Sequence, residues 1–277
     1  MKKRIVRTLV TVLVILLDLF IVGLLVREYL TTKTVSQSSL FRAGLILAGS
    51  VLSLAKLFVQ REIKRTPKTY RETYGDLIGN AFWNEKKAEA LFCRALDAYN
   101  ASLYSTALKR LERLSEQAKS SDDRFTVAVF SALCYDDMKQ PKQAIVYYQQ
   151  ALLQRENSTV YSNMGLSYRN LGNAEKALDA YEEAIKLDPS NAYPYNNATN
   201  LLIDQGDYEA ALSYAQKATE INQRFRQAYT AQAICHAMLN NTEQYEIAVR
   251  KAVACGENRQ RLETVIASLS PMEATDE

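Results

Sequence analysis

Apolar residues are distributed in two different ways along the chain. Two continuous apolar runs lie near its start, at residues 8–26 and 40–59. Beyond about residue 88, apolar residues recur every three or four positions, as on the buried face of an amphipathic α-helix. We therefore predict an all-α protein, in which two N-terminal transmembrane helices precede an α-solenoid of helical hairpins.

The first apolar run has the length of a membrane span. At a rise of 1.5 Å per residue it covers about 28 Å, close to the thickness of the hydrocarbon core. A cleaved signal peptide is the alternative. The run is longer than the apolar part of a typical signal peptide, and no small-residue cleavage site follows Val26.

The second apolar run is interrupted only by Arg42 and Lys56, near its ends, where long side chains reach the lipid headgroups. We predict that residues 1–60 form a transmembrane hairpin. Small residues spaced four apart allow close helix approach in lipid, so they offer a route to oligomerisation. They are Gly44, Ala48, Gly49 and Ser53.

Basic residues flank this hairpin on one side. Four Lys or Arg precede the first span and five follow the second, at residues 61–71, whereas the connecting loop has two. Positive charge is retained in the cytoplasm, so both termini are expected there. We expect a bacterial inner (plasma) membrane, with a eukaryotic organelle as the alternative. Asp18, near mid-membrane, is interpreted as a carboxylic acid bonded to a serine of the other span, or else as a sensing group.

Charge divides the chain. Residues 1–72 carry 13 Lys/Arg and 4 Asp/Glu, a net +9, and the remaining 21 Lys/Arg and 27 Asp/Glu give residues 73–277 a net −6. An acidic body argues against nucleic acid as a partner. Residues 61–87 are basic and then aromatic. We interpret them as a juxtamembrane linker on anionic headgroups, its aromatics at the interface or against the first hairpin.

The body has an internal period. Two alanines seven residues apart, with tyrosine between them, recur at steps of 33 and 34 residues. The three segments are Ala144–Ala151, Ala177–Ala184 and Ala211–Ala218.

These segments resemble the tetratricopeptide repeat family, whose units carry an aromatic, Leu-Gly, Tyr, a turn Gly, Ala, an aromatic, Ala and Pro. Residues 158–191 match nearly throughout, with Tyr161, Met164, Gly165, Tyr168, Gly172, Ala177, Tyr181, Ala184 and Pro189. The other predicted units are 88–121, 125–157, 192–225 and 226–259, followed at 260–277 by a capping helix and an acidic tail. Small residues such as Gly165 are expected where two helices approach most closely.

The resemblance implies that the first helix of each unit lines a binding groove. Its inward positions are Ser162, Leu166, Asn196, Asn200, Thr230 and Ile234, and Arg169, Tyr193 and Asp204 are expected as further contacts. Asn196 and Asn200 share one helix face, and an amide both donates to and accepts from a peptide backbone. The alternative is that these amides only solvate an exposed face. The predicted function is a membrane-anchored scaffold or adaptor that binds a peptide segment or a partner protein.

Two other functions are alternatives to this scaffold. The repeats could instead self-associate and cluster the membrane hairpins. An enzyme is disfavoured because the sequence has one histidine and lacks a phosphate-binding loop, a nucleophile elbow and an HExxH motif. Four dispersed cysteines form no CxxC pair, so neither a metal nor another cofactor is expected. We expect buried free thiols in a reducing compartment.

Overall fold

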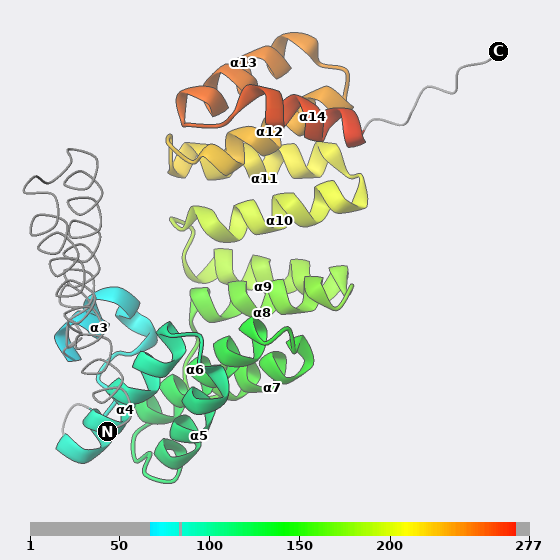
Figure 1. The fold of residues 1–277 in the computed structure, drawn as a ribbon. Coiled ribbons are helices and arrows are strands. Elements are labelled where there is room, and N and C mark those ends of the chain that lie inside the picture. Colours follow the sequence, from blue (N-terminus) through cyan, green and yellow to red (C-terminus); the bar gives the residue numbers. More distant parts are fainter. Residues whose placement is uncertain (1–66, 83–84, 270–277) are drawn as a thin grey trace, which may run out of the picture. The chain divides into compact units, whose positions relative to one another are not determined.

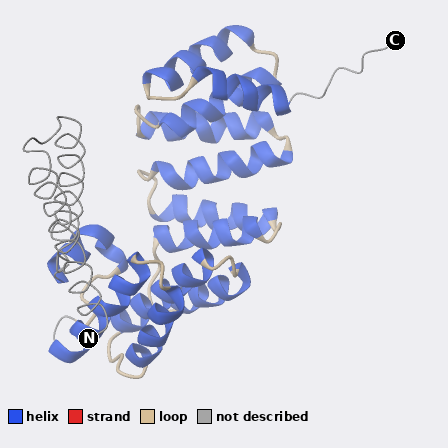
Figure 2. Ribbon diagram, viewed as in Figure 1, coloured by secondary structure: helices blue, strands red, loops and turns tan. Residues whose placement is uncertain are grey.

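The computed structural model describes residues 67–82 and 85–269 (Figure 1). The predicted transmembrane hairpin, Asp18 within it and the acidic tail lie outside these residues. Every helix of the described part is too short or too polar to cross a lipid bilayer. Figure 2 shows the described chain as helices joined by loops and turns.

Antiparallel helical pairs fill residues 86–254. They are α4 (Lys86–Asn100) with α5 (Tyr104–Ser115), α6 (Ser121–Asp137) with α7 (Pro141–Leu152), α8 (Ser158–Asn170) with α9 (Ala174–Leu187), α10 (Ala192–Gln205) with α11 (Tyr208–Ile221), and α12 (Arg226–Met238) with α13 (Thr242–Ala254). The helices of each pair pack against each other, and each second helix packs against the first helix of the next pair. This is the all-α solenoid expected from the sequence.

Short polar side chains set where the helices begin. The Asn157 side chain accepts from the backbone N–H of Val160 at 3.0 Å and caps α8, and the Asp207 side chain caps α11 in the same way. Gly206, with φ of 79°, ends α10 in the left-handed conformation that glycine adopts without strain. Each turn is therefore encoded locally.

Helices α8 and α9 approach each other closely at Gly165 of α8. A Cβ atom added there would lie 2.6 Å from Cε1 of the Tyr181 ring in α9. In the next repeat the larger residue of the pair is on the first helix, because Thr199 takes the place of Gly165 and Ala215 takes the place of Tyr181. Both pairs are buried, so each crossing is filled by one large and one small residue.

Residues 67–82 pack against the first repeats. They form α3 (Pro67–Tyr74) and η1 (Gly75–Leu77), followed by a short turn. Leu77 and Ile78 are buried, and the Tyr74 ring meets the edge of Phe130 at a centroid distance of 4.9 Å. Tyr74 also donates its hydroxyl to Asn100 of α4 at 2.8 Å, so this aromatic lies against the first predicted hairpin as well as the second.

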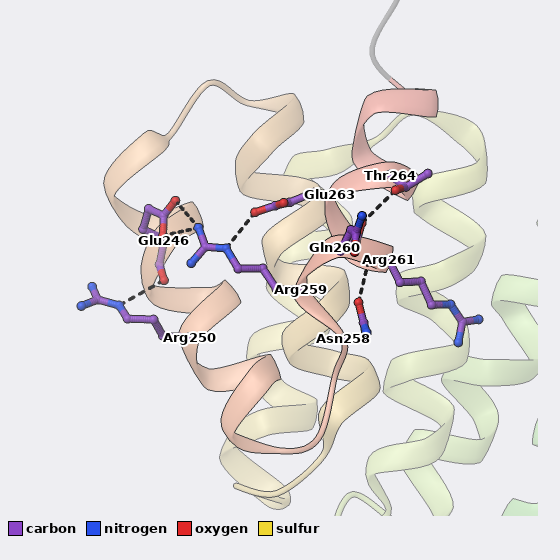
Figure 3. A network of polar contacts seen from close by, with 8 residues as sticks. All are labelled: Glu246, Arg250, Asn258, Arg259, Gln260, Arg261, Glu263 and Thr264. Atoms are coloured by element: carbon purple, nitrogen blue, oxygen red, sulfur yellow. Dashed lines mark hydrogen bonds and ion pairs between the residues drawn. The ribbon is translucent and has the colours of Figure 1, made fainter.

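The last described helix, α14 (Arg259–Leu269), covers the C-terminal end of the array. Leu262 is buried in the apolar cluster of α12 and α13. Arg259 donates to Glu246 of α13 at 3.1 Å and to Glu263 of α14 at 2.7 Å (Figure 3). Such exposed ion pairs contribute little to stability, so burial of Leu262 is the main attachment of α14.

Candidate functional site

The first helices of the last three repeats form one continuous face. Helix α8 contacts α10 and α10 contacts α12, whereas the second helices make no comparable contacts with one another in the described part. The predicted inward residues lie on these three helices. We call this surface the inner face.

A hydrogen bond joins the inner face across two repeats. Asn197 Nδ2 of α10 donates to Ser162 Oγ of α8 at 3.1 Å. Ser162 is buried, so its hydroxyl links repeats and is not displayed to solvent. Asn197 is not among the residues predicted from the sequence, although Asn163 lies one 34-residue period before it and is a signal for the position.

Asn196 and Asn200 differ in environment. Only 8% of Asn196 is exposed, and its Oδ1 has no hydrogen-bond partner. Asn200 is half-buried, one turn further along α10. A buried acceptor without a donor costs about 1–3 kcal/mol, so Asn196 Oδ1 is an unsatisfied acceptor within α10.

Arg169 and Asp204 pair with each other. Nε and Nη2 of Arg169 lie 2.9 and 2.5 Å from Oδ2 of Asp204, which joins the C-terminal ends of α8 and α10. Both were predicted as ligand contacts. Here each already has a partner, so a ligand at this end would meet a neutral ion pair.

The remaining predicted residues flank the amides. The Tyr193 side chain is 68% exposed, and its ring meets the edge of Phe225 at 5.3 Å between centroids. Thr230 Oγ1 lies 3.1 Å from both the Arg226 carbonyl and Glu257 Oε2, so it is engaged within the protein. Tyr193 is displayed to solvent at the start of α10, whereas Thr230 is not free.

Residues 77–82 cover part of α6, the first helix of the repeat that precedes α8. Thr126 of α6 is fully buried, and its hydroxyl lies 3.1 Å from the Leu77 carbonyl and 3.2 Å from the Ile78 carbonyl. Phe82 donates its backbone N–H to Asp123 at 2.8 Å. Although burial opposes ionisation of Asp123, hydrogen bonds from the backbone of Ser120, Phe82 and Lys119 lower its pKa.

Among the described residues, no group of three or more His, Cys, Asp or Glu side chains lies close enough together to hold a metal ion. Cys134 and Cys235 are buried, and burial raises the pKa of each thiol to about 12. Cys93, Cys134, Cys235 and Cys255 are all free thiols.

Sequence models of the tetratricopeptide repeat match three segments, residues 127–157, 158–191 and 180–213. Residues 127–213 carry tetratricopeptide repeats. The resemblance seen in the sequence is confirmed for these units, and the repeat is a protein-interaction fold.

Two curated relatives match part of the chain. A TPR repeat-containing protein of Methanocaldococcus jannaschii is 26% identical over 117 residues, which are 42% of this chain and 20% of the relative. The small glutamine-rich tetratricopeptide repeat-containing protein 2 of Mycosarcoma maydis is 31% identical over 80 residues, 28% of this chain and 23% of the relative. The matches thus span about a fifth to a quarter of these relatives.

A solved structure has the same fold. It is YrrB, described as a TPR protein with an unusual peptide-binding site. The superposition has a TM-score of 0.52 and 19% sequence identity, and it covers 66% of this chain and 94% of YrrB. At this identity the likeness shows the fold.

Proposed function

We propose that this protein is a scaffold that holds a peptide segment of a partner protein on the inner face of α8, α10 and α12. The repeats work on the cytoplasmic side of a membrane, to which residues 8–26 and 40–59 attach them. The peptide-binding description of YrrB is in keeping with this proposal.

The unpaired Oδ1 of Asn196 carries the proposal. A peptide laid along α10 brings backbone N–H groups, which are donors of the kind this acceptor lacks. Asn200 lies four residues later on the same helix face and is half-buried, so a second amide is within reach of the same segment. Such contacts recognise a backbone without requiring one particular sequence.

Apolar surface beside the amides supplies the other part of the binding energy. Leu166 of α8 is 39% exposed and Tyr193 of α10 is 68% exposed. Burying exposed apolar area contributes about 25 cal/mol per Å². The ligand is therefore expected to be an uncharged segment with at least one apolar side chain, because Arg169 and Asp204 neutralise each other.

Membrane attachment rests on the sequence. The two apolar runs have the length of spans, and the basic flanks predict that both termini are cytoplasmic. Membrane fractionation tests this directly, and release of the full-length chain by an alkaline carbonate wash would contradict it. If the repeats instead serve self-association, the 66–277 fragment will be oligomeric by light scattering, whereas a stable monomer disfavours that alternative.

Crosslinking in cells tests the binding face. Asn196→Ala combined with Asn200→Ala should remove one group of crosslinked proteins that the wild-type chain captures. The matched control is Gln143→Ala with Gln150→Ala, two exposed amides of α7 outside the inner face. The proposal fails if the inner-face variant captures every partner as efficiently as the control does.

A further inference from the structure

A second polar site lies on the opposite side of α12 from the inner face. Gln232 and His236 follow Thr230 and Ile234 by two positions, a rotation of about 200° around the helix. Together with residues of α11 and α13 they line a cavity of about 240 Å³. An engineered cavity of about 150 Å³ accommodates benzene, so a small organic group fits here.

Gln232 and His236 are polar, whereas the residues at the same positions of an earlier repeat are mainly apolar. Met164 and Tyr168 of α8 lie 68 residues before Gln232 and His236, which is two periods. The adjoining part of α11 also differs, because Ala215, whose carbonyl accepts from Gln232, lies one period after the buried Tyr181. The cavity therefore results from departures from the repeat pattern at several positions.

The Gln232 amide has a fixed orientation. Its Nε2 donates to the Ala215 carbonyl at 3.1 Å and to Thr219 Oγ1 at 2.9 Å. A carbonyl only accepts, so the NH₂ end must face Ala215, and Oε1 remains as an acceptor. Gln232 itself is 92% buried, since 8% of it is exposed.

His236 adds a second unsatisfied group beside it. It is also only 8% exposed, and its Nδ1 has no hydrogen-bond partner. Burial lowers the pKa of His236, which keeps the imidazole neutral at pH 7. Gln232 and His236 are four residues apart on α12, so both line one wall of the cavity.

The charges around the cavity are few and balanced. Glu220 accepts from Lys217 at 2.8 Å, and Lys251 lies over the Tyr229 ring, 5.6 Å from its centroid. Glu220 and Lys251 both line the cavity and are exposed, whereas Gln232 and His236 are buried. A charged ligand at the two buried residues would be desolvated without a counter-ion, so a neutral ligand is favoured.

We propose that this cavity binds a primary carboxamide group. Its N–H donors match the acceptor Gln232 Oε1, and its carbonyl accepts from the rim, where Gln216, Gln244 and Lys251 are exposed. The group comes either from a Gln or Asn side chain of a bound protein or from a small free amide. This site is independent of the inner face and of the function proposed for it.

His236 is the only histidine in the chain, so its imidazole gives a single set of signals in long-range ¹H–¹⁵N NMR spectra. The full-length chain is titrated with acetamide and, separately, with the capped peptide N-acetyl-Ala-Gln-Ala-N-methylamide. The control peptide has Met in place of Gln, which preserves the shape and removes the carboxamide. A saturable shift with the Gln peptide supports a protein side chain as the source, and saturation by acetamide alone supports a free amide.

Substitutions locate the binding. Gln232→Met removes the acceptor Oε1, keeps the imidazole reporter and should weaken binding by at least about tenfold. Gln227→Met, the same change at an exposed position of α12, should leave it unchanged. Gln244→Ala at the exposed rim gives a second test if Gln232→Met unfolds. The proposal is overturned if neither probe saturates, if the Met peptide binds as well as the Gln peptide, or if Gln232→Met and Gln244→Ala both bind normally.

Discussion

The crossing of α8 and α9 at Gly165 and Tyr181 yields a quantitative prediction. An added Cβ at Gly165 would lie 2.6 Å from Tyr181 Cε1 and 3.0 Å from the Ala177 carbonyl oxygen. Carbon atoms in contact prefer about 3.5–4.0 Å, so about 1 Å of extra separation is needed. Overpacking of this size costs about 1–3 kcal/mol, against a gain of a few tenths of a kcal/mol in helix propensity for Gly165→Thr.

The neighbouring repeat suggests the compensating change. Thr199 and Ala215 occupy the positions of Gly165 and Tyr181 one period later. Tyr181→Ala alone should cost about 3–5 kcal/mol, as for other large-to-small changes in a core. Combined with Gly165→Thr, the new methyl and hydroxyl groups fill part of the cavity. The double variant should therefore be about 2 kcal/mol more stable than the sum of the single changes predicts.

Urea unfolding followed by far-UV circular dichroism measures these free energies on the 66–277 fragment, which is one compact unit. Because repeat arrays can unfold in parts, hydrogen exchange of the α8 and α9 amides serves as a local measure. Additive effects, within about 0.5 kcal/mol, would refute the argument that the two side chains share one space.

Three further predictions concern buried polar groups. The Tyr181 hydroxyl is buried without a partner, so Tyr181→Phe should raise the free energy of unfolding by about 1 kcal/mol in the same urea assay. Burial raises the pKa of Asp136 despite its hydrogen bonds from Ser167 and Tyr148, so the folded state holds its proton to higher pH than the unfolded chain does. Stability should therefore fall as pH rises from the ordinary Asp pKa through the raised one. In Asp136→Asn the urea midpoint of unfolding should depend less on pH across this window. A midpoint that varies with pH as steeply as in wild type would contradict the prediction. Asn157→Ala removes both the α8 cap and the bond to Asp76, and should cost about 1–2 kcal/mol; a melting temperature equal to that of wild type would contradict this.

The period of the sequence by itself determined the architecture. Hairpins, their turns and the small residue at the crossing of α8 and α9 follow from local rules, because helix caps, turn glycines and amphipathic spacing act within one repeat. The matching of residues 127–213 to the tetratricopeptide repeat and the burial of Gly165 against Tyr181 agree with that derivation.

Only the tertiary structure decided which side chains meet. Arg169 and Asp204 are 35 residues apart, and periodicity places both on the inner face without indicating that they pair with each other. Thr126 is covered by residues 77 and 78, a contact between segments nearly 50 residues apart that no local pattern encodes. The polar cavity at Gln232 and His236 likewise arises where α11, α12 and α13 come together. A repeating sequence fixes the face on which a residue lies, whereas its partner depends on how neighbouring helices are rotated and spaced.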